Sequence, residues 1–329
     1  MKALVTGATG FIGSHIADQL LEKGYQVRCT IRKTSNLRWL EGKNVELIEV
    51  SFSSPESLKS AVENVDYIFH VAGVVAAKSI DGFMKGNKDA TKNLLEATYR
   101  FNPNIKRFLH VSSLTVNGPA GSIDEPIRET SPYNPLSKYA KSKIEAEKIA
   151  IEYMNKLPIT IVRPPAVYGP RDKDIFIMFD LMNKGFIFYT GYKTHYLSLV
   201  HVTDLARGII EAAESEKTIG EIYFVSSDEI YTWQQVYDVI KTVIKRKKYF
   251  EVRIPNFIII LAGILSQFFG LFKKKAAIFT YDKAIDMIQL YQTCSTQKAK
   301  RDFGYQQKVS LAQGIESTYK WYIDNNWLK

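Results

Sequence analysis

The stretch Lys2-Ala3-Leu4-Val5-Thr6-Gly7-Ala8-Thr9-Gly10-Phe11-Ile12-Gly13 decides the fold. It opens with a short, mostly apolar run that predicts a buried strand, and residues 14–23 follow as an amphipathic helical stretch. Between them Gly7 allows a tight turn, Gly10 lets a pyrophosphate approach the backbone, and Gly13 lets the helix pack close to the strand. The N-terminus of that helix presents free N–H groups to the phosphate. The stretch therefore predicts dinucleotide binding, and the alternative is a glycine-rich turn without a ligand.

The composition indicates a globular chain with one large domain and an appended lobe. The chain has 329 residues, of which 46% are hydrophobic and 24% charged. Cys29 and Cys294 lie far apart and match no ligand spacing, so we expect a reducing compartment and no metal site. Because the first strand begins at Lys2, we expect no signal peptide and a cytoplasmic protein.

The net charge of +10 suits nucleic acid, a membrane surface or an anionic cofactor. No nucleic-acid-binding motif accompanies this charge, so we expect no nucleic acid partner.

Apolar strands alternate with helical stretches as far as residue 167. We expect strands at 2–6, 25–31, 45–50, 67–71, 107–111 and 159–162, and helices at 14–23, 55–62, 88–100 and 135–155. This alternation predicts an α/β fold, a Rossmann-type doubly wound parallel sheet with helices on both faces. Residues 1–167 are expected to form the dinucleotide-binding domain, and 168–329 mainly a smaller, interleaved substrate-binding lobe.

The second half has weaker patterns. We expect a strand near 221–226 that returns to the main sheet, and helices at 174–188 and 231–245. Ser310-Leu311-Ala312-Gln313 is a capping box that opens a final helix.

The end of the second strand bears on the choice of cofactor. NAD enzymes often place an acidic residue there to bind the ribose 2′-hydroxyl. Arg32 stands at this position instead, in a run without an acid, and its guanidinium can bind a 2′-phosphate. We therefore expect NADP(H) in preference to NAD(H), unless Arg32 is only a solvated charge. After the third strand, Ser51 and Phe52 are expected beside the adenine.

Tyr139 and Lys143 carry the expected chemistry. Their spacing of four places them on one face of the helix expected at 135–155, with Asn134 as its N-cap and Pro135 as its first residue. A free tyrosine has a pKa of about 10, and a neighbouring ammonium lowers that pKa. Tyr139 is then a general acid or base tuned by Lys143. Ser113, just past the fifth strand, is placed to hold a substrate oxygen, and Ser112 is the competing choice.

These motifs together resemble the extended short-chain dehydrogenase/reductase superfamily, which includes NAD-dependent epimerases and dehydratases. The resemblance rests on the glycine run, Ser113, Tyr139-x-x-x-Lys143 and the run Arg163-Pro164-Pro165-Ala166-Val167-Tyr168-Gly169-Pro170, and it covers nearly the whole chain. It implies hydride transfer with a nicotinamide cofactor while Tyr139 exchanges the proton. It also implies that Lys143 binds the cofactor ribose and that Asn87 helps to hold Lys143 and a proton-relay water. The further cofactor contacts that it implies are Thr6, Phe11, Ile12, Val71, Ala72, Gly73, Pro165 and Val167.

Within the superfamily, the sequence is most similar to dihydroflavonol-reductase-like and 3β-hydroxysteroid-dehydrogenase-like members. Ser113 is followed by Leu114-Thr115, without the carboxylates that dehydratases of the superfamily use, which argues against elimination chemistry. A nucleotide-sugar epimerase and a cofactor-sensing binding protein without turnover remain alternatives. Family members are often homodimers through a four-helix contact.

The uncharged run at 257–272 is the most apolar part of the chain, and basic residues flank it. As a helix it spans about 24 Å, less than the bilayer core of about 30 Å. The alternatives are a buried helix of the lobe, a surface helix that covers a pocket or rests on a membrane, and a spanning helix. We therefore hypothesise a peripheral membrane contact through 257–272.

The expected pocket strips are also apolar. They comprise Val74, Val75, Ala76, Ala77, Phe83, Met84, Ile175, Phe176, Met178 and Phe179. The usual arginines for a diphosphate are hard to find, and His195 lies near the place of one of them. The sequence thus predicts an NADP(H)-preferring oxidoreductase for a carbonyl and secondary alcohol pair on a fairly apolar small molecule.

Overall fold

One parallel sheet forms the centre of the computed structural model, which describes residues 1–271, 277 and 279–328. The strand order is β10-β6-β5-β4-β1-β2-β3, and all neighbouring pairs are parallel. The strands are β1 (Lys2–Thr6), β2 (Gln26–Ile31), β3 (Val45–Glu49), β4 (Tyr67–His70), β5 (Arg107–Val111), β6 (Ile159–Arg163) and β10 (Glu221–Phe224). The chain order reverses at β1, which confirms the predicted Rossmann-type, doubly wound fold.

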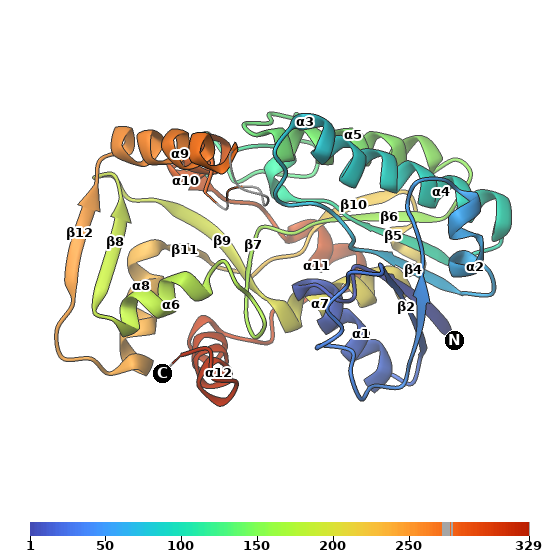
Figure 1. Cartoon of the computed structure of the whole chain (residues 1–329), viewed down its shortest axis with the longest axis horizontal. Coiled ribbons are helices and arrows are strands. Elements are labelled where there is room, and N and C mark those ends of the chain that lie inside the picture. The colour runs from blue at the N-terminus through green and yellow to red at the C-terminus, as the bar shows by residue number, and fades with distance from the viewer. Residues whose placement is uncertain (272–276, 278, 329) are drawn as a thin grey trace.

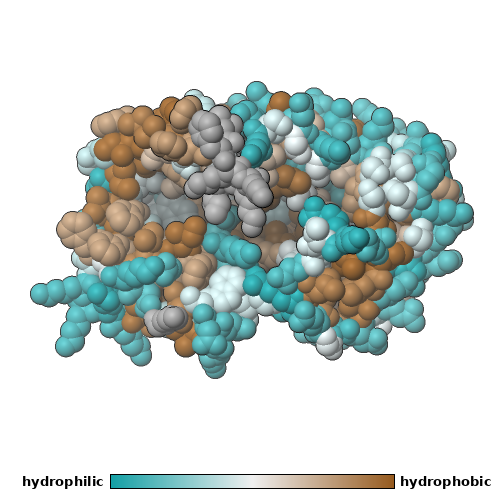
Figure 2. Space-filling model, viewed as in Figure 1, coloured by the Kyte–Doolittle hydropathy of each residue, from teal (hydrophilic) through white to brown (hydrophobic). Residues whose placement is uncertain are grey.

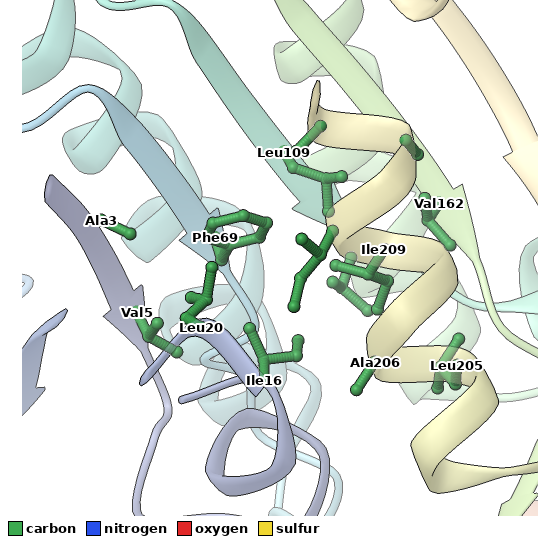
Figure 3. Packing of buried hydrophobic residues seen from close by; sticks show 14 of the residues in the cluster. Ala3, Val5, Ile16, Leu20, Phe69, Leu109, Val162, Leu205, Ala206 and Ile209 are labelled. Atoms are coloured by element: carbon green, nitrogen blue, oxygen red, sulfur yellow. The ribbon is translucent and has the colours of Figure 1, made fainter. Parts of the chain in front are cut away.

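Helices cover both faces of this sheet (Figure 1). One face carries α1 (Phe11–Glu22) and α7 (Val202–Glu214). The other carries α2 (Lys59–Val62), α4 (Ala90–Phe101) and α5 (Lys138–Tyr153), with α3 (Ile80–Met84) preceding α4. Figure 3 shows Leu20 of α1 next to Val5 and Phe69 of the strands, and Ile209 of α7 near Leu109 and Val162 in the same buried cluster. Burial of these side chains fixes α1, and with it the glycine run, against the end of β1.

The chain re-enters this layer after residue 167. The strand expected near 221–226 is β10, which pairs with β6. Besides α7, the later helix α11 (Gln297–Phe303) also packs into the same buried cluster, through Ala299. We keep residue 167 as the proposed domain boundary, with α7, β10 and α11 as later segments of the first domain.

The lobe has a core of its own around two small sheets. In the first, β9 (Tyr196–His201) pairs with β7 (Ala166–Tyr168), β11 (Ile230–Thr232) and β13 (Tyr291–Gln292). In the second, β8 (Phe186–Thr190) pairs with β12 (Phe250–Ile254). The lobe helices are α6 (Phe176–Asn183), α8 (Trp233–Ile244), α9 (Asn256–Leu271), α10 (Tyr281–Met287) and α12 (Leu311–Asp324).

Several expected helix boundaries are wrong, and the first helix already begins at Phe11 rather than residue 14. The helix expected at 174–188 ends at Asn183, because residues 186–190 pair with β12 as β8. The helix expected at 231–245 begins at Trp233, since Thr232 forms a capping box. The helix that carries Tyr139 begins at Lys138, and its N-cap is Ser137 rather than Asn134. The capping box at Ser310 is confirmed and opens α12.

The apolar run at 257–272 forms α9, apart from Phe272, which lies outside the described residues. The buried-helix alternative is wrong, because Phe257, Phe268 and Phe269 are 69%, 54% and 60% exposed. Within residues 1–271, 277 and 279–328, no helix combines the length and the apolar character needed to cross a bilayer.

Candidate active site

The glycine run forms a backbone cradle between β1 and α1. Gly7 has φ +74°, and a Cβ on it would lie 2.8 Å from the backbone nitrogen of Ala72. A Cβ on Gly13 would lie 2.3 Å from the Gly7 carbonyl oxygen. Gly10 is exposed and caps α1 without a side chain. Only glycine fits at positions 7 and 13, and the open backbone at Gly10 fits a dinucleotide pyrophosphate.

The side chain of Thr6 bonds the backbone that follows β4, and its expected role as a cofactor contact stays a prediction. The side chain is fully buried, and its Oγ1 accepts hydrogen bonds from the backbone N–H groups of Val71 (3.2 Å) and Ala72 (3.1 Å). The same oxygen lies 2.8 Å from Nδ1 of His70. Thr6 therefore joins the ends of β1 and β4. It positions Val71 and Ala72, which lead to the exposed Gly73.

The expected adenosine contacts lie at the ends of β2 and β3. Arg32 is exposed directly after β2, and its backbone N–H donates to the Ser35 hydroxyl at 2.9 Å. Ser51 is exposed after β3. The ring of Phe52 stacks on His70 with centroids 6.2 Å apart and packs against the core. Arg32 and Ser51 are thus accessible to a ligand, whereas the Phe52 ring belongs mainly to the packing.

Ser113 and Tyr139 meet at the carboxyl end of β5. The Ser113 hydroxyl hydrogen-bonds Tyr139 and accepts a bond from Thr115 Oγ1 at 2.9 Å. Both Ser113 and Tyr139 line the large cavity described below. Ser112, the competing choice, is buried, and its Oγ has no hydrogen-bond partner among the described residues. The geometry therefore favours Ser113 as the residue that contacts a substrate oxygen.

Lys143 follows Tyr139 by one helical turn, and its ammonium group bonds the end of β5. Its Nζ donates to the Val111 carbonyl oxygen at 2.7 Å. Burial lowers the pKa of Lys143 to about 8, although the nearby Glu147 carboxylate favours the charged form. Burial raises the pKa of Tyr139 to about 12, against the opposing effect of the Ser113 hydrogen bond. In this arrangement desolvation, with the Asp286 charge, raises the tyrosine pKa, and the expected lowering of that pKa by Lys143 stays a prediction.

The side chain of Asn87 bonds Val74 and Ser142, whereas its expected partner was Lys143. It lies in a π-helical turn over Lys85–Asp89, and its side chain exchanges hydrogen bonds with the backbone of Val74 (2.7 and 3.0 Å). It also donates to Ser142 Oγ at 2.8 Å. The side chain therefore fixes the strip after β4 against α5, next to Lys143, and its expected direct support of Lys143 stays a prediction.

The loop expected at the nicotinamide follows β6. Pro165 lines the cavity, and Val167 in β7 packs partly against the core. Beyond β7 the Arg171 guanidinium donates to Ser14 Oγ (3.0 Å) and Asp18 Oδ2 (2.7 Å). These bonds tie the loop to α1, so the phosphate cradle and the Pro165 region are held as one unit.

A cavity of about 770 Å³ lies in front of Ser113 and Tyr139, between the main sheet and the lobe. This volume suits a drug-sized or lipid-sized molecule. Of the expected pocket residues, Val75, Ala76, Ala77, Phe83 and Met178 line it. Phe176 and Phe179 pack in the lobe core instead, and Val74, Met84 and Ile175 are not among the lining residues.

Polar groups gather at one part of the cavity wall. His195, Ser198, Gln292 and Asp286 line it, and His195 Nδ1 lies 2.9 Å from the Gln289 carbonyl oxygen. Burial, with the neighbouring Asp282 charge, raises the pKa of Asp286 to about 6. The wall can therefore accept hydrogen bonds from a polar group of a mostly apolar ligand.

A model of the NAD-dependent epimerase/dehydratase family matches residues 3–235. The chain belongs to this family. A ceramide reductase from Caulobacter vibrioides (strain NA1000 / CB15N) is 27% identical over 325 residues, which cover 98% of this chain and 95% of that protein. A decarboxylating sterol-4-alpha-carboxylate 3-dehydrogenase from Dictyostelium discoideum is 24% identical and covers 96% of this chain and 99% of its own length. The crystal structure of gox2253 matches with a TM-score of 0.82 at 26% identity, over 99% of each chain.

Family membership confirms the resemblance to the extended short-chain dehydrogenase/reductases and makes the protein an NAD-dependent oxidoreductase. The glycine cradle, Arg32 and Lys143 stay the residues that we expect to bind its dinucleotide.

The sequence patterns did not predict that α10 contributes to the candidate active site. Asp286 and Met287 line the cavity from α10, and Trp233 and Tyr189 line it from α8 and β8. No motif marks residues 279–292, and Tyr189 lies in a stretch whose apolar residues also suit a helix. Pairing of β8 with β12, which spacing alone does not reveal, brings Tyr189 to the wall.

Proposed function

We propose that this oxidoreductase interconverts a carbonyl and a secondary alcohol on a fairly apolar substrate and prefers NADP(H). The observation that carries the proposal is the cavity of about 770 Å³ with Ser113 and Tyr139 in a mainly apolar wall. Among the described residues that line it, none is an arginine that could grip a diphosphate. Its lysines share the wall with aspartates, and Lys283 lies 3.5 Å from Asp174. These features favour an apolar substrate over a nucleotide sugar.

The relatives support the same substrate class. Two of them are named as a ceramide reductase and a sterol-4-alpha-carboxylate 3-dehydrogenase, and both match nearly the whole chain. The preference for NADP(H) rests on Arg32, which follows β2 in a run without an acidic residue. A guanidinium attracts a 2′-phosphate, whereas a carboxylate would repel it.

A bound nicotinamide dinucleotide supplies the hydride in reduction and accepts it in oxidation. In reduction, Ser113 donates a hydrogen bond to the substrate carbonyl oxygen, and the Tyr139 hydroxyl gives that oxygen its proton. Oxidation runs the same proton back to a Tyr139 phenolate. Lys143 stabilises this phenolate through its positive charge once Nζ leaves the Val111 carbonyl. Its pKa of about 8, although lowered by burial, is still above neutral pH, so most of the lysine remains charged there.

Cofactor turnover by the purified protein tests the proposal. A membrane-lipid extract and then a nucleotide-sugar mixture are offered with NADP(H) or NAD(H), with Tyr139→Phe as the blank. Net turnover with the lipid fraction and NADP(H) supports the proposal. Interconversion of a nucleotide sugar without net cofactor change would instead identify an epimerase. Tight cofactor binding without turnover on either mixture would favour the binding-protein alternative. A homodimer and a cytoplasmic location stay predictions.

A further inference from the structure

The helix α9 turns its large apolar side chains toward solvent. Phe257, Ile258, Leu261, Ile264, Leu265, Phe268 and Phe269 are between 43% and 69% exposed. They recur every three to four residues, so they form one continuous stripe along the helix, called here the α9 stripe. Figure 2 shows the resulting hydrophobic area over α9 at the upper left. Large exposed apolar areas of this kind mark interaction surfaces.

Two glycines on the inner side of α9 are in close contact with their neighbours, which fixes the orientation of the helix. A Cβ on Gly263 would lie 2.9 Å from Cβ of Ala284, and a Cβ on Gly270 would lie 2.8 Å from Cβ of Ala277. Between them the side chain of Gln267 accepts a hydrogen bond from the backbone N–H of Tyr281 at 3.2 Å. The helix packs too closely on α10 for its phenylalanines to turn inward. The α9 stripe is therefore the face that this packing leaves outside.

The charges around α9 suit an anionic surface. The chain has no acidic residue between Glu251 and Asp282. Arg253 precedes the helix, and the sequence Lys273-Lys274-Lys275 follows it. A helix with an apolar face and adjacent basic residues binds in the plane of the membrane interface, with attraction to anionic lipid headgroups. At about 24 Å, the helix is also too short to span the bilayer core.

We propose that α9 docks the protein on an anionic lipid bilayer, with the α9 stripe in the headgroup and acyl boundary. The docking does not depend on the proposed reaction. It has a consequence for the site, however, because Gln267 and Gly270 of the same helix line the cavity. An apolar molecule in the bilayer would lie one helix away from Ser113 and Tyr139.

Vesicle flotation tests this docking with the full chain. The vesicles contain phosphatidylcholine alone or a mixture of phosphatidylglycerol and phosphatidylcholine. The test variant is Phe268→Ser with Phe269→Ser. The matched control is Ile151→Ser with Ile323→Ser, which replaces exposed apolar residues of α5 and α12, 37% and 40% exposed. Circular dichroism and thermal melting establish that each protein is folded.

We expect the wild type and the control to float with the anionic vesicles, and much less with phosphatidylcholine alone or at high salt. The test variant should partition at least about 30-fold less, because each inserted phenylalanine contributes strongly to transfer from water. Failure of the wild type to float, or equal flotation of all three proteins, would overturn the proposal. A third outcome would also overturn it. If light scattering shows a dimer for the wild type but not for the test variant, and neither protein floats, the partner of α9 is a second copy of the chain.

A fluorescent label gives a second, independent measurement. An environment-sensitive dye on Leu261→Cys should brighten and shift to the blue with anionic vesicles, whereas the same dye on Ile151→Cys should not. The native Cys29 and Cys294 are buried, which limits labelling to the introduced thiol. Equal responses at both positions would show that α9 is not the inserted face.

Discussion

Gly10→Ala separates phosphate binding from folding more cleanly than any other change in the glycine cradle. Gly10 has φ −92°, which alanine adopts without strain, and a Cβ there meets only the Gly7 carbonyl oxygen, at 3.2 Å. We therefore expect a change in the free energy of unfolding within about 1 kcal/mol. The added methyl stands on the open backbone where a pyrophosphate would rest. Cofactor affinity should fall by about 10- to 100-fold, or about 1.4 to 2.7 kcal/mol.

Calorimetric titration with NADPH and NADP⁺ measures this loss, and denaturant unfolding measures the stability. Gly121→Ala is the control, because that glycine is exposed, lies outside the cradle, and a Cβ on it meets nothing within 4 Å. Gly13→Ala provides the contrast. Its Cβ would lie 2.3 Å from the Gly7 carbonyl oxygen, so it should cost stability as well as affinity, by about 1–3 kcal/mol or more. A folded Gly10→Ala protein with unchanged affinity would refute the placement of the pyrophosphate.

The remaining predictions concern the cofactor, the proton, a buried ion pair and pH. Arg32→Asp should weaken NADPH binding far more than NADH binding, and an equal loss in titrations of both would make Arg32 a surface charge. Tyr139→Phe should reduce turnover by about 10²- to 10⁴-fold with nearly unchanged cofactor affinity; retained turnover would assign the proton to another group. Glu147→Gln should destabilise by about 3–5 kcal/mol in denaturant unfolding, because Arg163, 2.5 Å from the fully buried carboxylate, loses its charged partner. Glu145→Gln, at a partly exposed ion pair on the same helix, should cost under about 1 kcal/mol, and equal costs would count against the buried pair. Asp286→Asn should raise the melting temperature above pH 6 and leave it unchanged near pH 4. The pKa of Asp286 in the folded protein, about 6, exceeds the ordinary 3.8, so the folded state binds a proton more tightly than the unfolded state. Wild-type stability therefore falls as the pH rises from about 4 to about 6, and the asparagine removes this loss. A gain at pH 4 as large as at pH 8 would exclude this titration.

Local patterns were sufficient for the parts of the site that neighbouring residues determine. The glycine cradle depends on β1, α1 and the turn between them, which are consecutive in sequence. Tyr139 and Lys143 lie four residues apart on α5, so helix geometry alone places them on one face. Ser113 is the second residue after β5, and parallel strands bring their carboxyl ends to one edge. These residues were predictable because each relation spans one element or one crossover.

Properties that depend on distant segments could not be read from the sequence in the same way. The spacing of Tyr139 and Lys143 suggested a lowered tyrosine pKa, but the direction is set by burial under the lobe. Thr6 matched a cofactor motif, yet its hydroxyl is used by the backbone at residues 71 and 72. In both cases the motif identified the position, and tertiary packing decided what the side chain does there.

The helix α10 shows most clearly why the second half resisted prediction. Its Asp282 carboxylate accepts a hydrogen bond from the Lys138 backbone N–H at 2.8 Å, and its Asp286 bonds Ser137, the N-cap of α5. On its other side α10 carries α9. One short helix without a sequence motif therefore joins the start of the Tyr139 helix to the apolar face proposed for the membrane. Because Asp286 also lines the cavity, a ligand there would contact α10, the helix that supports both α9 and the start of α5. Substrate specificity should therefore be sought in α10.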